Sequence, residues 1–117
     1  MDSLPLVLAS SSVSRLKLLQ DAGIYPISTI NTDVDESELK NEKPEHYCAR
    51  VSRLKFDAAV NLLTIPRAIL LAADTAAVAG RKILHKAGTR EEVRRYLQLL
   101  SGKRHSVMTS IVCGLIE

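Results

Sequence analysis

A chain of 117 residues of which 46% are hydrophobic is long enough to bury the core of one domain, but not of two. Its formal net charge of +3 comes from lysines and arginines that are scattered among carboxylates, which suits a polyanionic small molecule as well as a nucleic acid. With three Tyr, one Phe and no Trp, the chain offers few rings on which unpaired bases could stack. We therefore expect no specific nucleic-acid partner.

The N-terminus and the cysteines are typical of a cytoplasmic protein. Asp2 stands where a signal peptide needs basic residues, and the apolar run at 68–80 is too short to span a membrane and contains Asp74. Cys48 and Cys113 lie far apart, without the spacing of a metal site or a redox motif. We expect both to be reduced, to behave as small buried hydrophobes, and the chain to have no membrane partner.

The first elements in chain order are a strand, a helix and a second strand. Residues 5–10 form an apolar run of strand length, and apolar residues then recur at helical spacing until Gly23. Residues 25–31 are rich in β-branched side chains and predict another strand. The polar, acidic stretch 32–44 follows as a loop that is long enough to carry function.

A long amphipathic helix is predicted from Pro44 to about Leu63, with the proline near its first turn. Its apolar stripe recurs every three or four residues and consists of Tyr47, Val51, Leu54, Ala58 and Leu62.

The remaining elements are two strands, a helix and a final strand. Residues 67–74 predict a strand that is covered on both faces, and residues 77–84 predict its partner. Thr89 and Glu92 form a capping box for a helix that ends near residues 101–102, before a last strand from His105 onward. The alternation of strands and helices indicates an α/β layered architecture, whose last strand would leave an apolar edge able to promote a homodimer.

The stretch Ser10-Ser11-Ser12 leads into a helix that carries Arg15 in its first turn. Backbone N–H groups, hydroxyls and a guanidinium would meet there, as in a phosphate-binding site. The alternative is that the serines only cap the helix and the arginine is solvated.

Asp74 is expected at the C-terminal end of a buried strand, where open α/β sheets bind ligands, and could hold a divalent cation or activate water. It could equally be a turn-capping residue. The acidic segment 33–36 could supply an oxygen ligand for magnesium or simply be solvated. Lys55 and Lys86 could each reach a phosphate, or lie on the surface.

Six segments in this order and spacing resemble the Maf family of nucleoside triphosphate pyrophosphatases: LASSSVSRLKLL, DVDE, RLKFDAA, AADTAAV, KILHK and LQLLSGKRHSVMTSI. The resemblance covers the whole chain. It implies an elongated mixed-sheet α/β fold similar to that of the inosine triphosphate pyrophosphatases, with only the N-terminal portion present in a single incomplete domain, 1–117. It also implies hydrolysis of a nucleoside triphosphate to the monophosphate and pyrophosphate, assisted by Mg²⁺ or Mn²⁺.

Residue by residue, the resemblance implies three roles. Asp74 matches the family's proton acceptor, and Glu36 its loop carboxylate; both are candidate metal ligands. The positions that resemble phosphate-binding residues are Ser10, Ser12, Arg15, Lys55 and Lys86. The positions that resemble specificity-setting sites are Ser14 and Thr75.

The sequence departs from the family pattern in two ways. Val13 and Ala87 stand where the family usually has proline, and the family's later GxYxIQG-like and GLP-like motifs do not occur here. A pyrimidine nucleotide such as dTTP or UTP, or a modified nucleotide, is the substrate that the resemblance favours. Two alternatives are a truncated nucleotide-binding or interaction module without turnover, and a basic nucleic-acid binder linked to the family's association with septum formation.

Overall fold

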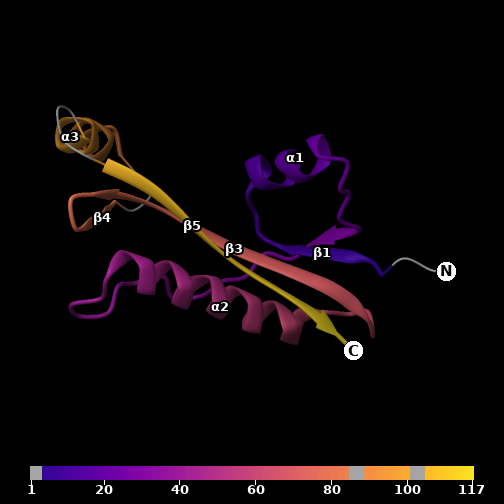
Figure 1. Ribbon diagram of the computed structural model, residues 1–117. Coiled ribbons are helices and arrows are strands. Elements are labelled where there is room, and N and C mark those ends of the chain that lie inside the picture. The colour runs from indigo at the N-terminus through magenta and orange to yellow at the C-terminus, as the bar shows by residue number, and fades with distance from the viewer. Residues whose placement is uncertain (1–3, 85–88, 101–104) are drawn as a thin grey trace.

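The computed structural model describes residues 4–84, 89–100 and 105–117. It contains one five-stranded mixed sheet and three helices, in an elongated shape of 53 × 32 × 23 Å (Figure 1). The elements in chain order are β1 (Leu6–Ala9), α1 (Val13–Asp21), β2 (Ser28–Thr29), α2 (Pro44–Leu62), β3 (Ala68–Ala79), β4 (Lys82–Leu84), α3 (Arg90–Leu100) and β5 (His105–Ile116). The expected α/β architecture with a mixed sheet is confirmed.

Strand β3 is the centre of the sheet. One of its edges pairs antiparallel with β5 along its whole length, from Ala68 opposite Ile116 to Ala79 opposite His105. Its other edge is shared, because β1 runs parallel to residues 69–72 and β4 runs antiparallel to residues 77–79. Among the described strands, none pairs with residues 73–76 on that edge. This gap in the pairing positions the site.

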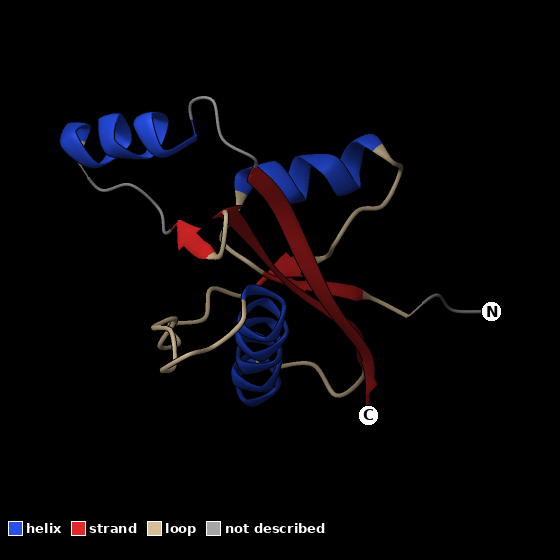
Figure 2. Cartoon of the chain, turned by 60° about the vertical axis from the view of Figure 1, so that its left-hand side comes forward, coloured by secondary structure: helices blue, strands red, loops and turns tan. Residues whose placement is uncertain are grey.

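Helix α2 covers one face of the sheet, and α1 lies on the opposite side (Figures 1 and 2). The buried core between α2 and the sheet falls into two clusters. One gathers around Phe56 and Ala59 against β1 and β3, and the other joins Tyr47, Cys48 and Val51 to Ala76 of β3. Burial of this apolar face is the main stabilising contribution to the fold.

The buried stripe of α2 differs from the predicted one. Tyr47 and Val51 are buried as expected, but Leu54 is 37% exposed and Leu62 is 53% exposed. The buried stripe combines two aromatic rings with small side chains, and consists of Tyr47, Cys48, Val51, Ser52, Phe56 and Ala59. Small residues let the helix approach the sheet closely, and the buried Ser52 hydroxyl is satisfied by Ser110 Oγ of β5 at 3.1 Å.

The prediction of separate strands at 67–74 and 77–84 places the break between the two strands too early in the chain. Strand β3 continues through Asp74 to Ala79, and Gly80 then adopts a φ of 63° in the turn to the short β4. Asp74 therefore lies in the middle of a strand and not at its end. The strand can continue through this buried carboxylate because Lys55 Nζ lies 3.0 Å from Asp74 Oδ1. The second predicted strand, 25–31, is reduced to the two residues of β2.

The two shorter helices begin at the predicted caps. The Ser12 side chain accepts from the N–H of Arg15 at the start of α1, and Gly23, with a φ of 81°, follows its end. Thr89 Oγ1 accepts from the N–H of Glu92 at 3.1 Å, as the capping box predicts. The predicted end of that helix at 101–102 falls outside the described residues.

Strand β5 has one covered and one open face. Val112 and Ile116 pack against the core under α2, whereas Val107, Ile111 and Leu115 are 67%, 65% and 50% exposed. Within the described strands, β5 pairs only with β3, so its outer edge is open as predicted. A homodimer through this edge stays a prediction.

The cysteines are both free, but only one is buried. Cys48 is 2% exposed in the core, while Cys113 points to the open face of β5. The expectation of two buried thiols is therefore wrong for Cys113, because strand alternation directs it away from α2. In the described parts of the chain, no helix has the length and apolar character that crossing a membrane requires.

Gly114 provides a test of the packing between β5 and α2. A Cβ at this position would lie 2.9 Å from Cζ of Phe56, so Gly114→Ala must displace a buried ring. Overpacking typically costs about 1–3 kcal/mol, which exceeds the roughly 0.5–1 kcal/mol gained by removing a strand glycine. We expect urea unfolding to show a net loss of stability. Cys113→Ala, on the open face, is the matched control and should change stability by no more than about 0.5 kcal/mol; equal losses in both variants would contradict this packing.

Candidate active site

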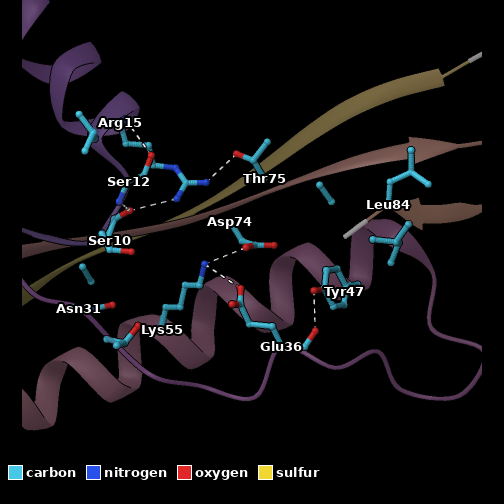
Figure 3. A pocket seen from close by; sticks show the side chains of 16 residues that line it. Ser10, Ser12, Arg15, Asn31, Glu36, Tyr47, Lys55, Asp74, Thr75 and Leu84 are labelled. Atoms are coloured by element: carbon cyan, nitrogen blue, oxygen red, sulfur yellow. Dashed lines mark hydrogen bonds and ion pairs between the residues drawn. The ribbon is translucent and has the colours of Figure 1, made fainter. Parts of the chain in front are cut away.

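The gap beside residues 73–76 of β3 opens into a cleft of about 810 Å³ (Figure 3). Strand β1 ends at Ala9, opposite Ala72, and β4 resumes the pairing only at Ala77. The chain after β1 turns away into the serines and α1, and the loop after β2 borders the cleft from the α2 side. Asp74, Thr75 and Ala76 are therefore the β3 residues that line the opening.

On the α1 side, Arg15 is held by hydroxyls from two directions. Its Nη1 donates to Ser10 Oγ at 3.4 Å, and its Nη2 donates to Thr75 Oγ1 at 2.9 Å. Thr75 Oγ1 also lies 3.0 Å from Thr109 Oγ1 of β5, which fixes the threonine in turn. A guanidinium has five N–H donors, so the arginine keeps capacity for an anion in the cleft.

The serines before α1 form a compact turn beside Arg15. Ser10 Oγ accepts from the N–H of Ser12 at 3.0 Å, and Ser12 Oγ accepts from the N–H of Arg15 at 3.3 Å. The start of α1 thus faces the cleft next to a cation, a combination that favours an anionic ligand. Ser11 also lines the cleft.

On the α2 side, one lysine joins two carboxylates. Lys55 Nζ lies 3.0 Å from Asp74 Oδ1 and 3.2 Å from Glu36 Oε1. The Asp74 side chain is 8% exposed and the Lys55 side chain 17%, while Glu36 is 52% exposed. Removing one partner of a buried ion pair costs about 3–5 kcal/mol, so Asp74 and Lys55 depend on each other. Glu36 presents the more accessible carboxylate of the cluster.

Tyr47 and Cys48 lie beneath this charged cluster. Burial, together with the negative charges of Asp74 and Glu36, raises the pKa of Tyr47 to about 12, so the phenol stays protonated and donates to Glu36 O at 2.7 Å. Burial and the charge of Asp74 also raise the pKa of the Cys48 thiol. A protonated, buried thiol is a poor nucleophile, so Cys48 is a packing residue beneath the cluster.

The loop that carries Glu36 is tied to α2 by a second ion pair. Arg50 donates to both Glu42 carboxylate oxygens, from Nε at 2.7 Å and from Nη2 at 2.9 Å, and Nη2 also donates to Ser37 O at 2.8 Å. The Arg50 guanidinium holds the pKa of Glu42 below its ordinary value of 4.5. Two parallel N–H to oxygen bonds fix this geometry more tightly than a single contact would.

The structure brings most of the sequence-predicted residues to one cleft. Those that line it are Ser10, Ser12, Arg15, Glu36, Lys55, Asp74 and Thr75. Ser14 is exposed on α1 and does not line the cleft, and Lys86 lies outside the described residues.

Sequence reasoning missed several polar lining residues, namely Asn31, Thr32 and Tyr47. Asn31 follows the short β2, and the rule that ligands gather after strands could have marked it. Tyr47 was assigned to the core stripe of α2, which is correct for its ring; no local pattern predicts that its hydroxyl reaches the acidic loop.

The fold and the cleft define an α/β domain in which an arginine–serine cluster faces a lysine–carboxylate cluster across a gap in a mixed sheet. Residues 5–115 match the family model described as Maf-like protein, and the chain belongs to this family. The resemblance noted from the sequence motifs is thereby confirmed.

Three characterised relatives illustrate the similarity. A nucleoside triphosphate pyrophosphatase of Anaplasma marginale (strain Florida) is 44% identical over 106 residues, covering 91% of this chain and 53% of the relative. A dTTP/UTP pyrophosphatase of Nitrobacter winogradskyi is 44% identical over 110 residues, with the same coverage, 91% and 53%. One of Ruegeria sp. (strain TM1040) is 41% identical over 105 residues, covering 90% and 53%. The chain spans about half the length of the curated relatives it matches.

The Glu42–Arg50 pair predicts a specific acid dependence. Since the folded-state pKa of Glu42 is lowered, its contribution to stability is complete above pH 4.5 and is lost as the pH falls through the lowered value. We expect the difference in unfolding free energy between wild type and Glu42→Gln to stay constant from neutral pH down to about pH 5 and then to shrink. Urea unfolding across the range measures it, and Arg50→Gln should remove the same component. Parallel wild-type and Glu42→Gln curves down to the lowest pH would contradict the pair.

Proposed function

We propose that this cleft binds a nucleoside triphosphate with a divalent cation and hydrolyses it to the nucleoside monophosphate and pyrophosphate. The observation that carries the proposal is the pairing of the two clusters. Asp74 joins Lys55 and Glu36 on one side, and its neighbour Thr75 joins Arg15 on the other. The family membership and the names of the relatives, nucleoside triphosphate pyrophosphatase and dTTP/UTP pyrophosphatase, support it.

The cations and the serine turn bind the phosphates in this proposal. Arg15 is arranged for bidentate contact, the start of α1 offers backbone N–H groups, and Ser10 and Ser12 add hydroxyls. Lys55 reaches the same cleft from α2, and Lys86 is assigned to phosphate binding by the family resemblance alone. A triphosphate carries several negative charges, so neutralising groups on both sides of the cleft favour its binding.

Glu36 and Asp74 would hold a divalent cation, Mg²⁺ or Mn²⁺. Both present carboxylate oxygens, the ligands these ions prefer, and both already approach one positively charged atom, Lys55 Nζ. No group of three or more His, Cys, Asp or Glu side chains gathers within the described ranges, so phosphate oxygens and water would complete the shell. When bound, the ion neutralises phosphate charge and polarises the phosphorus–oxygen bonds.

Asp74 is the proton acceptor of the proposed reaction. It accepts a proton from a water whose oxygen forms a bond to the α-phosphorus. The bond from that phosphorus to the bridging oxygen breaks, and its electron pair leaves with pyrophosphate. Lys55, 3.0 Å from Asp74 Oδ1, orients the carboxylate, and Arg15 stabilises the charge on the departing phosphates.

The base-selecting contacts are proposed at Thr75 and Ser14, and the preferred substrate is dTTP, UTP or another pyrimidine or modified nucleotide. Two relatives bear the name dTTP/UTP pyrophosphatase, which supports this choice. We place the activity in the cytoplasm and take 1–117 as belonging to a single domain of the family fold.

A second candidate is a nucleotide-binding or interaction module without turnover, for which the two cations that line the cleft, Arg15 and Lys55, would be sufficient. The two functions differ in one respect. The hydrolase binds Mg²⁺–dTTP and releases pyrophosphate, whereas the module binds the same ligand without releasing pyrophosphate.

Asp74→Asn tests the proton acceptor. Asparagine keeps the size and an oxygen for Lys55 but cannot take up the proton, so kcat should fall about 10²- to 10⁴-fold while nucleotide affinity changes little. Pyrophosphate release from dTTP, with affinity measured by calorimetry, checks both values. If wild type binds but releases no pyrophosphate, and Asp74→Asn binds as well as wild type, the binding module is the correct function.

Arg15→Ala and Ser11→Ala test the phosphate site as a pair. Loss of the charged hydrogen bonds of Arg15 should lower kcat/KM for dTTP about 10- to 100-fold. Ser11 is exposed and holds neither Arg15 nor the helix start, so Ser11→Ala should change kcat/KM by no more than about twofold. The reverse order of effects would sink the assignment of Arg15.

A further inference from the structure

We infer that Tyr47 and Arg50 are positioning residues that hold the loop before α2 so that Glu36 reaches the cleft. This inference rests on the proposed function for its catalytic consequence, but its structural part stands alone. Both residues lie on α2, the helix that also supplies Lys55. One element would therefore hold both the lysine and the carboxylate that meets it.

The loop needs such support because its own structure does not place Glu36. Residues 31–39 belong to no helix or strand, so backbone pairing within a sheet or helix does not fix them. The ion pair from Glu36 to Lys55 is 3.2 Å long, but the Glu36 side chain is 52% exposed. Solvent screens a half-exposed ion pair, so this contact alone holds the loop weakly.

Two side chains of helix α2 donate hydrogen bonds to two consecutive loop carbonyls. The Tyr47 hydroxyl donates to Glu36 O at 2.7 Å, and Arg50 Nη2 donates to Ser37 O at 2.8 Å. The two side chains are one helical turn apart, and the Arg50 guanidinium lies 5.7 Å from the Tyr47 ring centre. The backbone on both sides of the Glu36–Ser37 bond is thereby fixed against the helix, as Figure 3 shows for the Tyr47 contact.

Arg50 also fixes the far end of the loop. Its bidentate contact with Glu42 holds a carboxylate that accepts in turn from the N–H of Leu39 at 3.1 Å. The Arg50 side chain does not line the cleft, so its influence on a ligand passes through the loop. Tyr47 lines the cleft, and its hydroxyl donates to the loop backbone at Glu36 O.

The structural part is tested by hydrogen exchange of the 117-residue protein without nucleotide. Tyr47→Phe keeps the buried ring and removes only the hydroxyl. Arg50→Gln removes the guanidinium that donates to Ser37 O and to both Glu42 oxygens. Each should speed exchange of the amides in segment 37–42 about three- to tenfold and leave β5 unchanged. The matched controls are Tyr25→Phe, 70% exposed, and Arg53→Gln, an exposed arginine of the same helix. Unchanged exchange in segment 37–42 in both test variants would overturn the inference that Tyr47 and Arg50 hold the loop.

The link to Glu36 is tested by a double-mutant cycle with dTTP and Mg²⁺. Tyr47→Phe should lower kcat/KM about three- to tenfold in the wild-type background and less than about twofold in a Glu36→Gln background, because the residue it positions is already lost. Arg50→Lys keeps the charge but not the fork and should fall between wild type and Arg50→Gln. Equal losses in both backgrounds would overturn action through Glu36. If wild type neither binds nor hydrolyses nucleotide, the proposed function fails. The exchange result still decides whether Tyr47 and Arg50 hold the loop.

Discussion

A carboxylate buried in the middle of the central strand is the constraint on which the site depends. Asp74 lies in β3 with strand residues on both sides, and its side chain is 8% exposed. Leaving such a charge unpaired costs about 3–5 kcal/mol, a large part of the 5–15 kcal/mol that stabilises a typical domain. The fold meets this cost with Lys55 from α2 and with an opening in the sheet edge that admits water and ligand.

The same opening depends on short neighbouring side chains. Ala9 at the end of β1 and Ala76 of β3 both line the cleft, and neither has atoms beyond Cβ to fill it. Larger residues at these positions would occupy the space between β1 and β4. Alanine is a modest strand former, so the strand is stabilised here by its full-length pairing with β5 and its packing on α2 more than by local preference.

Local signals in the sequence predicted what is locally determined. The caps at Ser12 and Thr89 and the long helix from Pro44 follow from short-range patterns, and the structure confirms them. The continuation of β3 through Asp74 could not be predicted, since a carboxylate after an apolar run is typical of a strand end unless a distant lysine pairs with it. The stripe of α2 was misplaced because the contact with β5 favours the small Ser52 over Leu54.

The sequence predicts which residues belong to the site better than it predicts how they are arranged in space. The serine turn with Arg15 has a local pattern that indicates an anion site, whereas the patterns around Lys55 and Glu36 left open that both are simply solvated, and the family resemblance selected them. The meeting of the serine turn with Asp74 depends on the parallel register of β1 and β3, which sets Ala9 beside Ala72. That long-range pairing brings the chain after β1 next to Asp74, and no pattern within either segment encodes it.

Strand alternation then explains why two unlike clusters share one cleft. Successive side chains of a strand point to opposite faces, so Asp74 meets Lys55 on the α2 face while Thr75 meets Arg15 on the α1 face. In a fully paired sheet these two clusters would be separated by backbone. Because β1 and β4 leave residues 73–76 without a neighbour on that edge, both clusters border the same opening. A ligand at this edge can contact the cations of one face and the carboxylates of the other, which is the arrangement that a metal-bound polyphosphate requires.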